Sequence, residues 1–184
     1  MIIDRIDRAL DMTSAIVAGI DGGQYADASL CAGWTVRDEL NHLVGGMRIF
    51  TARLTGTDPG GEHHDDWLGD EPANAFHLAA EADRAAWRRP DALEGVIELG
   101  FGAVPAPAAA AIHHTEVLVH GIDLALVTGQ EKLVDDQECE RLLGEMRAMD
   151  FSMFRNPGMF GPETAVADDA PGHRRLLAFL GRAV

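Results

Sequence analysis

Apolar residues recur at alternating steps of four and three along residues 36–54, and this spacing constrains the fold more than any other feature. The repeat consists of Val36, Leu40, Leu43, Met47, Phe50 and Leu54. Such spacing gives a helix one apolar face, which is stable only when another element covers it. Thr35 and Asp38 resemble a capping box in front of the repeat, and Gly56 follows it as a stop. The sequence therefore predicts a long amphipathic helix.

A second repeat of the same kind predicts a helix over residues 107–127, which Gly129 would end. Its members are Ala108, Ile112, Thr115, Val119, Ile122 and Leu126. Further helices are expected over residues 4–20, 72–87, 136–151 and 173–180. Antiparallel helices with one apolar face each bury those faces best against one another. We therefore expect an all-α fold, a four-helix bundle with a short additional C-terminal helix and irregular connections.

Three features outside the two repeats carry expectations of their own. Residues 90–107 contain three prolines and three glycines, so an irregular connection is expected there, with a short extended piece at the letters VIEL. Trp34, just before the capping box, is expected to anchor the chain in the core. The methionines of the predicted fifth helix are expected to fill the core; they are Met146, Met149 and Met153.

Composition limits the class of protein. The chain has 184 residues and is 47% hydrophobic but only 6% aromatic, which favours one helical domain over residues 1–184. The net charge of -15 disfavours partners such as nucleic acid or an anionic membrane surface. The first residues include acids and lack an apolar run of signal-peptide length, so the cytoplasm is the expected location.

Cys31 and Cys139 are too few for a disulfide framework and should stay reduced in the cytoplasm. No basic residue or histidine flanks either cysteine in the sequence, so nothing nearby in the chain would lower a thiol pKa. We expect both to be small buried hydrophobes rather than nucleophiles.

A histidine and a glutamate in the predicted 107–127 helix have the spacing of paired metal ligands. Glu116 and His120 are four residues apart, so one helix face carries both. His42 falls near the edge of the apolar face of the 36–54 helix, beside Gly46, which leaves room for a neighbour or a ligand. From spacing alone two interpretations stay open: a site for one divalent metal ion, or an ordinary surface hydrogen bond.

Four stretches of the chain resemble one known family in the same order. CAGWTVRDELNHLVGG, at residues 31–46, is similar to the second-helix motif of the DinB-like, mycothiol-dependent maleylpyruvate isomerase metal-binding superfamily. TEVLVHGIDLALVTG, at residues 115–129, is similar to its second motif, in which a Glu and a His four apart are followed by an Asp. Residues 65–87 and 160–182 resemble one uncharacterised branch of the superfamily.

The resemblance implies a four-helix-bundle core and a metal ion bound by His42, Glu116 and His120. It also implies mycothiol as the thiol on which such a protein acts. The isomerase carries a further C-terminal domain that supplies an arginine to its active site, and this chain is expected to lack that domain.

Three protein ligands leave a coordination position open, as in a catalytic rather than a structural site. We expect zinc, although nitrogen and oxygen ligands also accept nickel, manganese or iron. The hypothesis is a thiol-dependent transferase or isomerase that acts on small electrophiles through a metal-bound thiolate. The expected partners are a small-molecule substrate and a low-molecular-weight thiol, and a homodimer is left open. The alternative is a metal-dependent binding or sensor protein without turnover.

Several polar residues near the ligands have two interpretations each. His113 is expected to neighbour the site or to be exposed rather than to bind the ion. Asp123 either orients His120 as a second-shell carboxylate or caps the helix, and Asp38 is explained most simply as a cap. The 56–70 loop carries residues that resemble a metal cluster, but glycines and acids make an ordered site there unexpected; they are His63, His64, Asp65 and Asp66.

Overall fold

A computed structural model of the chain describes residues 1–100, 102–156 and 159–184. Most of these residues are helical, and the predicted all-α, DinB-like class of fold is confirmed. The helices are α1 (Ile2–Ala18), α2 (Val36–Thr55), α3 (Pro72–Trp87), α4 (Ala106–Val127), α5 (Asp136–Arg147) and α6 (Gly172–Phe179). Short 3-10 turns are η1 (Gly22–Ala26), η2 (Glu131–Leu133) and η3 (Ser152–Phe154), and the strands are β1 (Val96–Leu99) and β2 (Gly102–Pro105).

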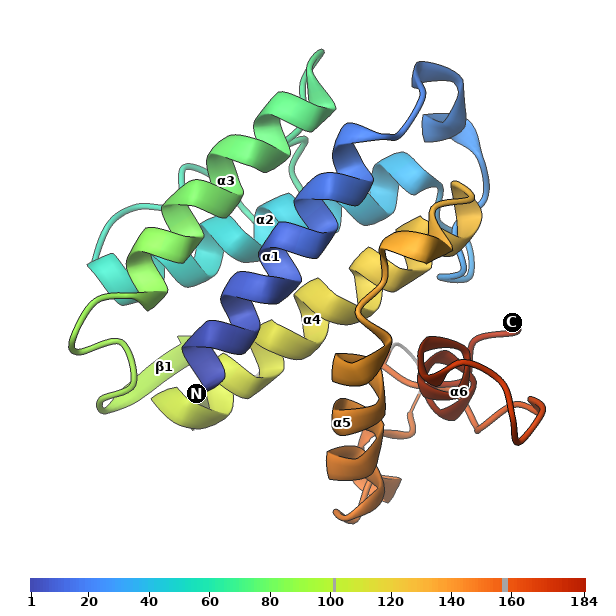
Figure 1. The fold of residues 1–184 in the computed structure, drawn as a ribbon. Helices are drawn as coiled ribbons and strands as arrows, with labels where there is room; N and C mark the ends of the chain where they lie inside the picture. Colours follow the sequence, from blue (N-terminus) through green and yellow to red (C-terminus); the bar gives the residue numbers. More distant parts are fainter. Residues whose placement is uncertain (101, 157–158) are drawn as a thin grey trace.

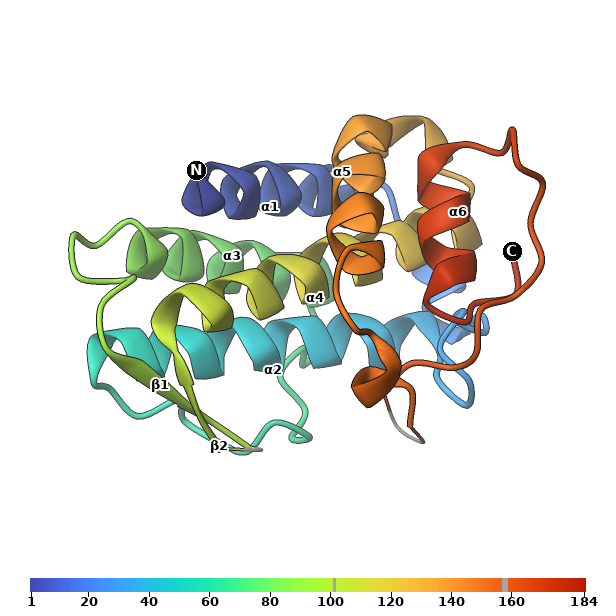
Figure 2. The same ribbon diagram turned by 90° about the horizontal axis from the view of Figure 1, so that it is seen from below.

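The four long helices α1 to α4 form one packed group. Helices α1 and α2 each pack against both α3 and α4, and Figure 2 shows α1 and α2 on opposite sides of the group. Helices α5 and α6 pack against each other beside this group, and α6 also contacts α4 (Figure 1). Buried apolar side chains from all six helices form one continuous cluster. The single domain over residues 1–184 remains a prediction.

Helix α2 begins and ends where the sequence predicts. The Thr35 hydroxyl accepts a hydrogen bond from the Asp38 backbone N–H at 3.2 Å, and the Asp38 carboxylate accepts one from the Thr35 N–H at 2.8 Å. Gly56 ends the helix at φ +71°, a left-handed conformation that favours glycine. These two caps fix the length of the helix that carries His42.

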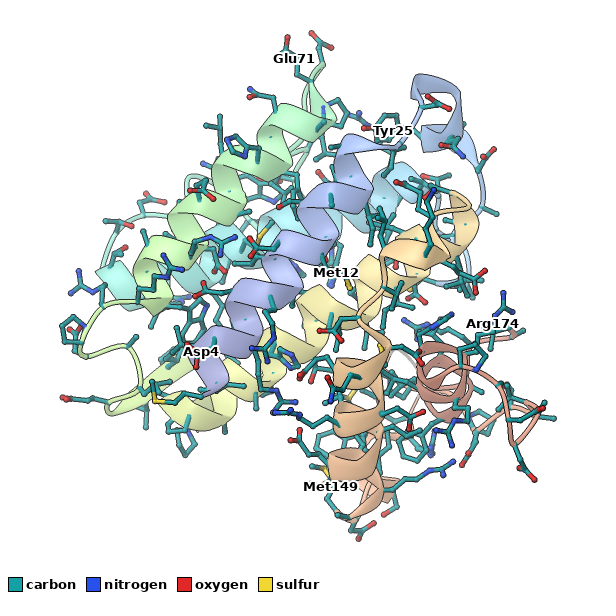
Figure 3. The ribbon with its side chains drawn as sticks, viewed as in Figure 1. Asp4, Met12, Tyr25, Glu71, Met149 and Arg174 are labelled. Atoms are coloured by element: carbon teal, nitrogen blue, oxygen red, sulfur yellow. The ribbon has the colours of Figure 1, made fainter. Side chains whose placement is uncertain are left out.

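Helix α4 is buried on more sides than its predicted apolar face. Ala108, the first member of the four-three repeat, is exposed, whereas Val117 and Leu118, which lie outside the repeat, are buried. The reason is that α4 packs against α1, α2 and α6 at once. Helix α1 crosses it closely at Gly121, where an added Cβ would clash with Thr13; Figure 3 labels the neighbouring Met12 at this crossing.

The connection before α4 is more regular than expected. Strands β1 and β2 pair as an antiparallel hairpin, with Val96 opposite Pro105 and Leu99 opposite Gly102. Ile97 points inward and is buried, and β1 contacts both α2 and α4. The hairpin therefore lies beside α2 and the beginning of α4 (Figure 2). Residue 101 lies outside the described residues.

The prediction for the end of the fifth helix was wrong. Helix α5 ends at Arg147, and the Asp150 carboxylate caps the next turn by accepting from the Ser152 N–H at 3.1 Å. The methionine spacing therefore does not continue along a helix face. Met146 is buried, but Met149 and Met153 are 51% and 72% exposed, and Met149 lies at the far tip of α5 (Figure 3). Only the first of the three methionines fills the core.

Among the described residues, no helix is both long enough and apolar enough to cross a membrane.

Candidate metal centre

The three predicted ligands meet at one point between α2 and α4. The Glu116 Oε2 atom lies 3.1 Å from His42 Nε2 and 3.4 Å from His120 Nε2. The ligand atoms of all three residues lie within 4.8 Å of one another. Bonds of about 2.0–2.2 Å in a tetrahedral set place neighbouring donor atoms roughly 3.3–3.6 Å apart. The observed separations are therefore close to those that a bound divalent ion requires.

Helix geometry explains the meeting. Glu116 and His120 lie one turn apart on α4, and the packing of α2 against α4 brings His42 opposite them. Burial by itself raises the pKa of Glu116, but hydrogen bonds with His120 and His42 outweigh it and hold the pKa far below its usual value. The carboxylate is thus ionised and aimed at two imidazoles, as a metal ligand must be.

Glu39 orients His120 from the opposite side of the ring. Its Oε1 atom lies 2.7 Å from His120 Nδ1, and both side chains are buried. A histidine that bonds a carboxylate through one ring nitrogen presents the other nitrogen to a metal ion in a fixed direction. The sequence interpretation missed Glu39. Its signal was a carboxylate inside the apolar face of the 36–54 helix, between Val36 and Leu43.

Asp123, which the sequence analysis considered for orienting His120, contributes less directly. Its Oδ2 atom is 3.7 Å from His120 Nδ1, and it accepts hydrogen bonds from Arg182 at 2.9 and 3.2 Å. Burial and the nearby Glu39 carboxylate raise the pKa of Asp123 to about 6. Asp123 therefore ties the C-terminal residues to the back of the metal centre. Asp38 caps α2, as the simpler interpretation predicted.

Cys31 is half-buried in this charged cluster, contrary to the expectation of a small buried hydrophobe. Its Sγ atom is 3.8 Å from His120 Nδ1 and 3.2 Å from the Arg182 guanidinium. Burial is the largest influence and raises the pKa of the Cys31 thiol despite these neighbours. The basic groups that sequence inspection did not find come from α4 and from residue 182, far along the chain. Cys139 is buried in the core, as expected.

Two overlapping groups of side chains could each hold an ion, and one fits better. The second group consists of Cys31, Glu39, His120 and Asp123. The Arg182 guanidinium already supplies a positive charge to that group, because it lies against both Asp123 and Cys31. Burial lowers the pKa of His120, but hydrogen bonds with Cys31, Glu116 and Glu39 raise it well above its usual value. Positive charge is thus favoured at this centre, and the donor set of His42, Glu116 and His120 fits a divalent cation.

Trp34 lies against the two histidines of the candidate metal centre and is not part of the hydrophobic core. Its ring is half-buried and lies 5.0 Å from the His42 ring and 6.1 Å from the His120 ring, between centroids. The prediction that Trp34 anchors the chain in the core was therefore wrong. An indole over two imidazoles limits their motion and keeps water from one side of the site.

A pocket of about 470 Å³ opens beside His42 and Glu116. This is within the size range of sites for small molecules. Its walls come from α2, α4, the β1–β2 hairpin and the loop over residues 56–71, and they include Gly46, Ile49, Phe50, Arg53, Glu98, Leu99, Ile112 and Val117. The candidate centre therefore borders a pocket on the side of His42 and Glu116, while Trp34 and Glu39 contact its histidines.

The histidine pair of the 56–70 loop does not form the metal cluster that its composition suggested. Asp66 pairs with Arg37 at 3.2 Å, and the Asp65 carboxylate accepts from the Glu62 N–H. His63 instead lines the pocket beside the centre, with its ring 4.7 Å from that of His42. Burial is the main reason that the pKa of His63 is lowered.

His113 is a neighbour of the site, as expected, but it is buried rather than exposed. Its Nε2 atom lies 2.7 Å from the Asp83 carboxylate of α3, and the ring packs between Phe50 and Trp87. The side chain also lines the pocket. Asp83, like Glu39, is a carboxylate inside an apolar helix face that sequence interpretation did not single out.

Three comparisons with known proteins point in one direction. Residues 6–125 match the family model described as the mycothiol maleylpyruvate isomerase N-terminal domain. An uncharacterised protein found in two strains of Mycobacterium tuberculosis is 30% identical over 178 residues, which cover 96% of this chain and 95% of the relative. The crystal structure of the mycothiol-dependent maleylpyruvate isomerase is similar with a TM-score of 0.52 and 19% identity, over 79% of this chain and 72% of that one. A histidine-to-alanine mutant of the isomerase gives a TM-score of 0.51.

Proposed function

The chain belongs to the family of mycothiol maleylpyruvate isomerase N-terminal domains, and from that premise we propose that it is a metal-dependent enzyme acting on a low-molecular-weight thiol and a small electrophile. One divalent ion, zinc by preference, is held by His42, Glu116 and His120. Mycothiol is the thiol that the family name suggests. The reaction is transfer of the thiol to the electrophile, or isomerisation through reversible addition.

One observation carries this proposal. Two imidazole nitrogens and one carboxylate oxygen, from two different helices, converge with separations of 3.1 and 3.4 Å at the mouth of a pocket. A surface hydrogen bond between a glutamate and a histidine needs only two of these groups. The third donor and the Glu39 bond behind His120 are the features of a metal ligand set.

Each residue has a defined task. His42, Glu116 and His120 hold the ion, and Glu39 keeps the His120 ring in the required orientation. A bound divalent ion would favour the thiolate form of a thiol that coordinates it. Trp34 shields the histidines, and the apolar pocket walls bind the electrophile away from bulk water.

The chemistry balances without an oxidant or a reductant. The sulfur loses its proton and forms a bond to an electrophilic carbon. When the thiol adds across an activated double bond, the sulfur bonds to one carbon and the adjacent carbon takes up a proton. The net reaction is the addition of one thiol. In isomerisation, rotation about the bond that has become single is followed by loss of the sulfur from one carbon and of the proton from the other. The double bond re-forms and the thiol is regenerated.

Metal analysis tests the site first. Elemental analysis of purified protein should find about one divalent ion per chain, and His42→Ala should lose most of it. Added zinc should raise the melting temperature of the wild type and a chelator should lower it, because an ion that binds only the folded state stabilises it.

A thiol assay tests the reaction. Metal-loaded protein is incubated with mycothiol and a panel of small electrophiles, and conjugate formation is followed against His42→Ala. Turnover by the wild type alone supports the proposal. Equal behaviour of both proteins, with no binding of the thiol, contradicts it. Binding without product would identify a metal-dependent binding or sensor protein instead.

A further inference from the structure

The loop over residues 56–71 is fastened to α2 next to the metal centre. The Asn41 side chain donates to the Asp65 carbonyl oxygen at 2.9 Å and accepts from the Trp67 backbone N–H at 2.8 Å. The Arg48 guanidinium lies over the Trp67 ring, 4.6 Å from its centroid. A loop that was expected to be loose thus has three anchors on one helix.

Two glycines of α2 allow this loop to approach the helix backbone. A Cβ added at Gly45 would lie 2.7 Å from Trp67 Nε1 and 2.8 Å from the His63 carbonyl oxygen, which are both impossible contacts. A Cβ at Gly46 would lie 3.9 Å from His63 Nε2. A glycine inside a helix costs about 1 kcal/mol relative to alanine. The two glycines therefore lower the stability of α2 but allow residue 63 to approach the helix backbone closely.

The approach brings an imidazole to the site. The His63 ring packs on His42, at 4.7 Å and 60° between rings, and its Nε2 atom lies over Gly46, one helical turn from His42. The neighbouring His64 is exposed. His63 stays outside the set of donors that lie within 4.8 Å of one another. Rotation about its two side-chain bonds changes the direction of the His63 ring nitrogens without moving the loop.

We propose that His63 is a fourth donor to the ion held by His42, Glu116 and His120, an inference that rests on the proposed metal site. Three protein donors leave a position open on the pocket side, and His63 lines that side. Imidazole is among the commonest ligands of divalent transition metals in proteins. His63 fills the position in the resting protein and leaves it when the sulfur of a thiol enters. The Gly45–Gly46 pair exists to bring this donor within reach.

Cobalt(II) titration tests the proposal, because the visible spectrum of this ion reports its coordination. The variants are His63→Phe, which keeps an aromatic ring on His42 but removes the donor, and His64→Phe as the matched control. We expect His63→Phe to bind cobalt at least about tenfold more weakly than the wild type and to change the visible bands. His64→Phe should match the wild type. Identical spectra and affinities for the two variants would overturn the inference.

Gly45→Ala provides a second route that leaves every donor in place. The added methyl group displaces the loop, so this variant should shift the spectrum in the same direction as His63→Phe. If Gly45→Ala weakens binding while His63→Phe does not, the loop acts through packing and the donor role is wrong. His42→Ala separates the claim of a metal site from the claim that His63 is a donor to it. A wild type that binds no cobalt, or no better than His42→Ala, overturns the metal site itself, whereas loss confined to His42→Ala overturns only His63.

Discussion

Helices α2, α3 and α4 contribute two buried histidine–carboxylate pairs, and only one of the two lies at the candidate metal centre. His120 Nδ1 is 2.7 Å from Glu39, and His113 Nε2 is 2.7 Å from Asp83. The first pair joins α4 to α2, and the second joins α4 to α3. The hydrogen bonds are equal in length, so their geometry does not distinguish a metal ligand from a tie between helices.

The second ring nitrogen makes the difference. His120 Nε2 faces the Glu116 carboxylate, where a further imidazole also points. The His113 ring lies between the aromatic rings of Phe50 and Trp87, and among the described residues its Nδ1 atom has no hydrogen-bond partner. Additional donor groups therefore face the second ring nitrogen of His120, and this separates the candidate metal centre from the pair in the core.

The carboxylates of the two pairs also differ in their surroundings. Glu39 accepts hydrogen bonds from the His120 ring and from the Ser29 hydroxyl at 2.6 Å, which outweigh burial and lower its pKa. Burial dominates at Asp83 and raises its pKa, and within the described part of the chain its Oδ1 atom lacks a hydrogen-bond partner. The surroundings of Glu39 thus favour its charged form, whereas the surroundings of Asp83 disfavour it.

Asp83→Ala should have the largest effect on stability and none on the ion. The change leaves a fully buried His113 without its partner and opens a cavity, so the free energy of unfolding should fall by about 3–5 kcal/mol. Urea unfolding measures the loss. Metal content should stay at the wild-type level, because no atom of Asp83 reaches the centre. Loss of the ion in a folded Asp83→Ala protein would break the distinction between the two pairs.

A double variant checks that this loss belongs to the pair. Removing His113 as well, as Asp83→Ala with His113→Ala, should cost less than the sum of the two single changes. The reason is that the double variant has lost both side chains of the pair, so neither is left in the core without its hydrogen-bond partner. Additive losses would show that the two residues act independently.

Glu39→Gln should weaken metal binding about 10–100-fold while the protein stays folded. The amide keeps the size of the side chain and can still accept from His120 Nδ1, but it no longer supplies negative charge. Competition with a chelator of known affinity measures the change. Glu98→Gln is the matched control, since Glu98 lines the same pocket without touching His120. An equal loss in both variants would assign the effect to general electrostatics.

Local signals predicted much of the fold. The helix from Val36 to Thr55 was defined by a capping box, an apolar repeat and a glycine, all within one segment. The extended piece expected at VIEL is strand β1, but its pairing with β2 was missed because four-residue strands are too short to show a period of two. The end of α5 was misplaced because three methionines kept the helical spacing after the helix had ended.

The site was predictable only where spacing within one helix carried the information. Glu116 and His120 satisfy that condition, and the family motifs added His42. Glu39 lies in an apolar face, a signal that is visible in the sequence but has several meanings. Arg182 could not be found, because its contact with Asp123 joins residues 59 positions apart and depends on how α6 packs.

The pH dependence of stability should distinguish the two histidine–carboxylate pairs by a smaller free energy than the substitutions above. The pKa of Asp83 is raised in the folded protein, so the folded state binds more protons than the unfolded chain above the ordinary value of 3.8. Stability from this group is complete below that value and is lost as the pH rises through the folded pKa. Relative to the wild type, Asp83→Asn should therefore gain stability with rising pH, by about 1.4 kcal/mol for each unit of pKa elevation. Urea unfolding of both proteins at several pH values measures the difference, and a constant difference would contradict the assignment.

Ser29→Ala should have the smallest effect and tests how finely the metal centre is supported. The Ser29 hydroxyl donates to Glu39 Oε2, while His120 bonds the other oxygen of the same carboxylate, so the ring keeps its partner. The variant also loses the bond that Ser29 Oγ accepts from the Cys31 N–H at 2.9 Å, and each lost bond costs about 0.5–1.5 kcal/mol in stability. Metal affinity should fall by less than the tenfold expected for Glu39→Gln, because the orienting charge remains. A loss as large as that of Glu39→Gln in the chelator competition would mean that the ion depends on the position of the carboxylate more than on its charge.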